Sequence, residues 1–186
     1  MLLARLALLA LLVSTATQAE PGPAQIGGFG VEGQAGVFGS RVTVGGEFGY
    51  HAFSEASLLS WQEKALIHGG AYGIRIDDSL FIGKPFVVAG MVLEPYLGLV
   101  LSLNSIVGGA LWVTPGAMLN VFLGAQRRLE VSAAALLPLN AIPGGTGAAV
   151  DVRFFLANEG FYFGVQTQLL PQNPFVVAAF GWAVTN

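Results

Sequence analysis

Residues 147–170 constrain the fold of this chain more than any other stretch, because apolar side chains alternate in it with small or polar ones. Val152 and Phe154 fall on one face of a predicted strand, and Asp151 and Arg153 fall on the other. A period of two places alternate residues on opposite faces of a strand. The alternation resumes after the turn residues Asn158-Glu159-Gly160, so the stretch predicts a β-hairpin.

The same pattern predicts the register of this hairpin. A loop of even length centred on Asn158-Glu159 sets Phe154 opposite Phe163, Val152 opposite Val165 and Asp151 opposite Gln166. A slip of one residue would place each apolar row beside a polar one, so only this register sorts the two faces.

The composition indicates which face meets which environment. The chain is 54% hydrophobic and only 10% charged, whereas soluble domains carry about 25% charged residues. The second face of the hairpin holds mainly Gly, Ala and Gln. Most of the later strands likewise have one apolar face and a second face of small or polar residues. A lipid-facing exterior around a narrow, mixed interior produces this pattern, and closing the sheet removes its edges. The sequence therefore predicts an all-β, antiparallel transmembrane barrel.

The first 19 residues have the layout of a secretory signal peptide. Arg5 precedes an apolar run from Leu6 to Val13, and Ala19 is a small residue suited to cleavage. The run is shorter than the ~20 apolar residues that a spanning helix needs. Export is therefore expected, and the absence of cysteine excludes a lipoprotein anchor and disulfide frameworks.

After the signal peptide, the chain divides into two predicted parts. Residues 20–39 are rich in glycine and form either a flexible segment or plug, or a first strand that carries Glu32 and Gln34 on one face. Residues 40–186 form the barrel. Counting strands from Arg41 gives about ten, within a range of about 8–12, each near the ~9–11 residues that a tilted membrane strand requires.

The expected boundaries between strands also predict the sidedness of the barrel. Leu66 to Ile76 is expected to be one strand, and Asp77-Asp78-Ser79 a turn. The two longest connections, 54–64 and 138–146, should then lie on one side, opposite the C-terminus. Outer-membrane barrels have long external loops, so both connections are expected outside the cell.

Residues 80–124 allow a second interpretation. They hold few charges, and a hydropathy scan could assign a transmembrane helix from Tyr96 to Val113. The strict alternation of leucines from Leu97 to Leu103, and breaks at Pro95 and Pro115, favour strands instead.

Taken together, the signal peptide, alternating strands, short turns and aromatic-rich final strand from Phe175 to Val184 resemble small bacterial outer-membrane β-barrel proteins as a class. This resemblance implies a monomer in the bacterial outer membrane, with the lipid bilayer and the outer-membrane assembly machinery as partners. Its expected role is structural, in envelope integrity, or that of a passive narrow pore. The alternatives are a soluble periplasmic β-barrel that binds an apolar ligand and a helical inner-membrane protein built on residues 80–124.

Several charged residues are expected to face the interior: Arg41, Glu47, Arg75, Asp151 and Arg153. A charge in a narrow interior of low dielectric needs a partner, so salt bridges that plug the lumen are the first expectation. A conducting path or a ligand site lined by these residues is the alternative.

Other chemistry is weakly indicated. His51 and His68 flank the 54–64 connection, but zinc requires three or four protein ligands, and parity puts His68 with Ile74 on the apolar face. His51 with Ser54 and Glu55 forms the one local cluster that resembles a hydrolase triad, without a recognisable motif. A net charge of −3 disfavours nucleic acid. No enzymatic activity, metal or cofactor is expected.

Overall fold

The computed structural model describes residues 27–54, 59–71, 73–88, 91–105, 108–123, 127–139, 145–157, 159–171 and 173–185. The predicted signal peptide, residues 1–19, lies outside the described residues. The strands are β1 (Gly28–Phe38), β2 (Arg41–Ser54), β3 (Leu59–Gly70), β4 (Gly73–Gly83), β5 (Phe86–Val88), β6 (Met91–Asn104), β7 (Gly108–Leu123), β8 (Arg127–Pro138), β9 (Gly147–Phe155), β10 (Gly160–Leu169) and β11 (Phe175–Thr185).

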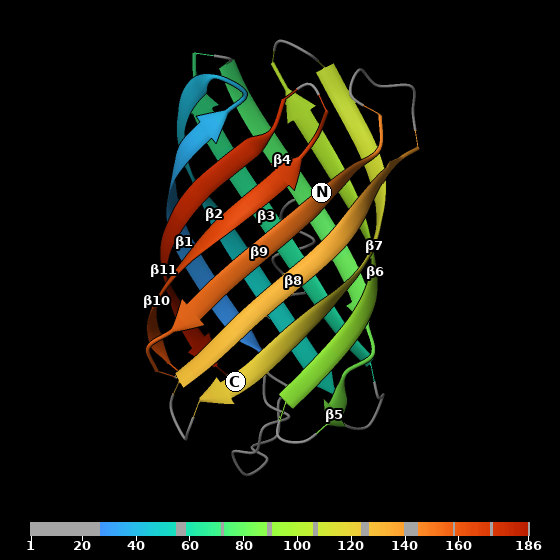
Figure 1. Cartoon of the computed structure of the whole chain (residues 1–186), viewed down its shortest axis with the longest axis vertical. Coiled ribbons are helices and arrows are strands. Elements are labelled where there is room, and N and C mark those ends of the chain that lie inside the picture. Colours follow the sequence, from blue (N-terminus) through green and yellow to red (C-terminus); the bar gives the residue numbers. More distant parts are fainter. Residues whose placement is uncertain are drawn as a thin grey trace, which may run out of the picture.

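The long strands form one closed antiparallel barrel (Figure 1). Each pairs with its neighbours in the chain, β4 pairs with β6, and β1 pairs with β11 to close the wall. The short strand β5 pairs with the beginning of β6 and adds nothing to the circuit. The wall therefore has ten strands, and the predicted antiparallel barrel is confirmed.

The register predicted for the 147–170 hairpin is confirmed. In the pairing of β9 with β10, Phe154 lies opposite Phe163, and Asp151 lies opposite Gln166. The outward phenyl rings of the first pair are 5.5 Å apart. Exposure alternates along β9 as the pattern requires, from 8% at Asp151 to 38% at Val152.

The barrel is apolar outside and polar inside. Every wall strand presents at least one large exposed hydrophobic side chain on the outer face, for example Leu97, which is 59% exposed. Most of the buried polar and charged side chains face the lumen, among them Glu32, Glu47 and Arg153. A soluble barrel with an apolar ligand inside would have the opposite arrangement, because water-soluble proteins rarely expose continuous apolar surface. The exterior therefore fits lipid.

The glycine-rich segment contains a wall strand. β1 pairs along its whole length with β2 on one side and β11 on the other, and Glu32 and Gln34 are both buried. The strands of the wall are not the ones counted from Arg41 in the sequence. The wall includes β1, which precedes Arg41, and it does not include the short strand β5.

The stretch from Leu66 to Ile76 is not one strand, which corrects the prediction. β3 ends at Gly70 and β4 begins at Gly73, whose positive φ of 90° suits a tight hairpin. The turn resets which residues face inward, so His68 is fully buried in the lumen rather than on the apolar face. Asp77 lies within β4, paired with Arg75, instead of in a turn.

The prediction that the two longest connections lie at the same end is also wrong. We call the end where β1 begins and β11 ends the terminal end, and the opposite end the far end. β2 ends at Ser54 and β3 begins at Leu59, opposite it, so the first connection begins and ends at the terminal end. Five wall strands (β3, β4, β6, β7 and β8) separate it from the connection after Pro138. An odd number places the two connections at opposite ends.

Residues 80–124 form strands where described, chiefly β6 and β7, and these pair along their length from Met91 to Asn104. The strands that the sequence favours for this region are therefore confirmed, and the alternative of a transmembrane helix from Tyr96 to Val113 is excluded. Across the described ranges, no helix has the length and hydropathy needed to span a membrane.

Close strand packing requires glycine at Gly45 on β2, and substitution there should destabilise the barrel. A Cβ atom at Gly45 would lie 2.1 Å from the carbonyl oxygen of Ile67 and 2.7 Å from the His68 ring. We expect Gly45→Ala to cost about 1–3 kcal/mol through overpacking. Gly33→Ala is the matched control, because nothing lies within 4 Å of its added Cβ. Denaturant unfolding in detergent measures both, and equal midpoints would contradict the expectation.

Candidate functional site: a charged network across the lumen

Arg153 on β9 lies at the centre of a charged network inside the barrel. Its guanidinium lies 2.8 Å from Glu47, 3.0 Å from Asp151, 3.2 Å from Glu32 and 3.5 Å from Glu130. These carboxylates come from β1, β2, β8 and β9 itself. Because β10 and β11 separate β9 from β1 in the wall, the network connects strands that are not neighbours and crosses the lumen.

The local part of the network follows from strand register. Glu130 pairs with Arg153 across β8 and β9, so both side chains belong to the same inward row. Asp151 is two positions from Arg153 on that same face. The contacts to Glu32 and Glu47 instead depend on barrel closure, which brings β1 and β2 opposite β9.

Neutral donors and a lysine complete the carboxylate environment. The hydroxyl of Tyr162 donates to Glu32 Oε2 at 2.8 Å, and Gln166 Nε2 donates to Glu47 Oε2 at 3.2 Å. Lys64 Nζ lies 3.8 Å from Glu47 and 3.7 Å from Asp151, so it makes longer ion pairs than Arg153 does. Buried carboxylates that are both paired and hydrogen-bonded can stay ionised.

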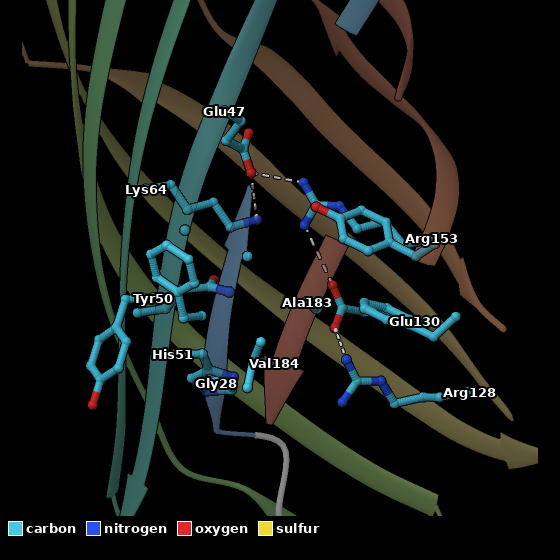
Figure 2. Close-up of a pocket in the computed structure, with 16 residues that line it drawn as sticks. Gly28, Glu47, Tyr50, His51, Lys64, Arg128, Glu130, Arg153, Ala183 and Val184 are labelled. Carbon is cyan, nitrogen blue, oxygen red and sulfur yellow. Dashed lines mark hydrogen bonds and ion pairs between the residues drawn. The ribbon is translucent and has the colours of Figure 1, made fainter. Parts of the chain in front are cut away.

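The network extends toward the terminal end and lines a cavity there (Figure 2). Figure 2 shows the chain of contacts from Lys64 through Glu47, Arg153 and Glu130 to Arg128. The Arg128 guanidinium also lies over the Phe155 ring at 4.0 Å. The cavity has a volume of about 70 Å³. We call it the mouth cavity.

A second cluster closes the lumen near the far end. The Arg75 guanidinium lies 5.1 Å from the centre of the Phe175 ring and 5.6 Å from that of Phe38. It also pairs with Asp77 and donates to Gln168 Oε1 at 2.6 Å. Leu66, Phe175 and Val177 form a buried apolar core beside it, in which Phe175 has no exposed surface. We call this group the far-end cluster.

The predicted interior residues divide among these sites. Glu47, Asp151 and Arg153 meet in the network, and Arg75 lies in the far-end cluster. Arg41 differs from the expectation. It is exposed, and its guanidinium donates to the carbonyl oxygen of Ala71 at 3.1 Å, because β2 begins at this residue and leaves it at the rim.

Four network residues were missed by the sequence reasoning. Glu32 lies in the segment whose structure was left open, and Lys64 lies in the stretch assigned to a connection. Arg128 is the second residue of β8. The position of Glu130 in an alternating run was a usable signal, because Ser132 and Ala134 share its inward face.

The two histidines lie apart. His51 Nε2 is 3.3 Å from Glu94, whereas the His68 ring contacts Thr43 and Gln34. Within the described ranges, no group of three or more His, Cys, Asp or Glu residues could hold a metal ion. The Ser54 side chain and Glu55, named for the hydrolase-like cluster, lie outside the described residues.

Comparison with known proteins supports the fold. No family model matches the sequence, and no curated protein sequence matches it either. Among solved structures, an outer membrane channel from Pseudomonas putida F1 is similar, with a TM-score of 0.50 and 9% sequence identity. The match covers 91% of this chain and 100% of the channel. At this level of identity, the similarity concerns the barrel architecture.

Proposed function

We propose that this protein is a small outer-membrane β-barrel that is closed at rest and serves a structural role in the cell envelope. The observation that carries the proposal is the Arg153 network, which connects β8 and β9 to β1 and β2 across the lumen. A wide pore would keep these walls apart.

The size of the barrel supports closure. A barrel of about eight strands has an interior that side chains fill, whereas open aqueous channels occur in barrels of about 16–18 strands. Ten strands lie near the closed end of this range. The far-end cluster adds a second obstruction, because Phe38 and Phe175 are paired at the ends of β1 and β11.

The outer membrane is the proposed location, and lipid and the outer-membrane assembly machinery are the proposed partners. The apolar outer face and the barrel fold support this location. A solved structure with a similar fold is that of an outer membrane channel. A monomer is proposed, because the closed wall leaves no strand edge that needs a second chain.

A second candidate function is a narrow pore that opens transiently. The observation that favours it is that the mouth cavity shares Glu47, Gln62 and Lys64 with a second cavity deeper in the lumen. Movement of these side chains would join the two spaces.

Planar-bilayer recording distinguishes the two functions. We expect purified wild-type protein, verified as folded by its heat-dependent electrophoretic mobility, to show no steady porin-like conductance. A general porin prepared in the same way is the control for insertion. A stable open channel from the wild-type protein would overturn the closed-barrel proposal, whereas brief, small openings would support the narrow pore.

A further inference from the structure

A chamber deeper in the lumen lies beside the charged network and has two unlike walls. Its volume is about 80 Å³. One wall is polar and includes Lys64, Asp151 and Gln166 of the network. A second part of the lining is apolar, and it includes Val100, Trp112 and Leu136, which form one buried cluster. The chamber is therefore amphipathic, unlike a lumen that is simply filled with water.

Two polar atoms in the lining have neither a hydrogen-bond partner nor an ion-pair partner among the described protein groups. They are Nε1 of Trp112 and Oγ1 of Thr114, both on the inward row of β7. Trp112 is 6% exposed and Thr114 is 1% exposed. Buried polar groups in folded proteins are nearly always satisfied, so these atoms indicate a guest with a hydrogen-bonding oxygen.

Glycines on β6 and β7 keep this chamber open. A Cβ atom at Gly98 would lie 2.2 Å from the Phe81 ring and 2.5 Å from the Thr114 hydroxyl. A Cβ atom at Gly116 would lie 2.7 Å from the Tyr96 ring. The two aromatic rings therefore lie against glycine in the wall, instead of extending across the space.

The chamber is reached from the terminal end. Glu47, Gln62 and Lys64 line both this chamber and the mouth cavity, so they form a neck between the two. The ion pairs of Lys64 are 3.7 and 3.8 Å long, beyond ordinary hydrogen-bond length, and its stem is flexible. Lys64 can therefore move aside while Arg153 continues to hold the network.

We propose that the chamber binds a small uncharged molecule with a short apolar body and one oxygen that accepts hydrogen bonds from both Trp112 and Thr114. A charged guest is disfavoured, because it would lose its hydration against the apolar wall while the nearby charges of the network are already paired. An apolar cavity of about 150 Å³ holds benzene, so this smaller space requires a guest with fewer heavy atoms than benzene. The proposal does not depend on whether the barrel conducts.

The experiment uses three probes that share a short alkyl chain and differ in the head group: 1-butanol, butylammonium and butyrate. The full-length protein, labelled with ¹⁵N-tryptophan and folded in detergent, gives indole resonances that single Trp→Phe variants assign. We expect 1-butanol to shift the Trp112 indole resonance saturably, with a Kd on the order of 1 mM. The two ions should produce no saturable shift at the same concentrations.

The resonances of Trp61 and Trp182 serve as internal controls. Trp182 is exposed on the outer face and Trp61 packs against Tyr50, so both report partitioning of the probe into detergent. Proportional movement of all three resonances would overturn the proposal. A Trp112 resonance that fails to move would also overturn the proposal, because it would mean that water alone forms the hydrogen bonds to Trp112 and Thr114.

Matched variants locate the binding. Ala134→Met fills the chamber from β8 and should weaken 1-butanol binding at least tenfold, whereas Ala133→Met on the outer face of the same strand should leave it unchanged. Thr114→Val, which removes one hydroxyl at nearly constant volume, should weaken binding severalfold and covers the case in which Ala134→Met fails to fold. Unchanged affinity in Thr114→Val, or equal effects of Ala134→Met and Ala133→Met, would place the guest elsewhere and refute the proposal.

Discussion

Replacing Arg153 by methionine is expected to lower the free energy of unfolding by about 3–5 kcal/mol, because breaking a buried ion pair leaves uncompensated charge in a medium of low dielectric. Four carboxylates lie within ion-pair distance of this one guanidinium. Lys64 is the other described cation close to Glu47 and Asp151, at 3.8 and 3.7 Å, and its single charge cannot balance all four carboxylates.

Equilibrium unfolding in denaturant, followed in lipid vesicles, measures this effect. Arg41→Met is the matched control, because Arg41 is exposed at the rim and its loss should change stability by less than about 1 kcal/mol. Adding Glu47→Gln to Arg153→Met should recover part of the loss, since it removes one of the stranded charges. If Arg153→Met and Arg41→Met destabilise the barrel equally, the network does not hold the lumen closed.

Placing a charge on the outer face should have the second largest effect. Val152 lies midway along β9 with 38% of its surface exposed, and the neighbouring strands place Val131 and Val165 opposite it. An arginine on the lipid face near the bilayer midplane costs about 2–4 kcal/mol. Val152→Arg is therefore expected to reduce folding into lipid vesicles far more than Gln166→Arg.

Gln166 is a suitable comparison because it lies one strand away and points inward, where its amide already contacts Glu47. Spin labels at positions 152 and 163 give an independent measurement. They should be quenched by lipid-soluble oxygen rather than by a water-soluble relaxant. Quenching by the water-soluble reagent would mean that the outer face is not in contact with lipid.

The sequence was most informative where one hairpin contained both of its strands and a short turn. Between Gly147 and Leu169 the alternation predicted the faces and the register, because every side chain there obeys a single parity. The closed form also followed, since an apolar exterior excludes open edges in lipid.

Prediction failed where a turn was misplaced, because each turn resets parity for the strand that follows. The sequence pattern did not reveal the hairpin turn after Gly70. The prediction therefore placed His68 on the apolar face and Asp77 in a turn, whereas His68 is buried and Asp77 lies in β4. The prediction began this strand at Leu66, whereas β3 begins at Leu59. As a result, Lys64 was assigned to a connection instead of the interior, and the connection before β3 was placed at the wrong end. Contacts such as Arg153 with Glu32 could not be predicted, because they join residues that only the closed barrel brings together.

The pairing of β1 with β11 has a consequence for how the chain reaches its native state. Gly28 lies opposite Thr185 and Phe38 opposite Phe175, so the seam of the barrel joins strands from opposite ends of the described chain. Such pairing gives a high contact order, and folding is correspondingly slow. Until β11 is in place, β1 presents an unpaired strand edge that can recruit other chains. The intermediate that awaits closure is thus the species most prone to aggregation, and a chaperone that shields β1 would act at that step.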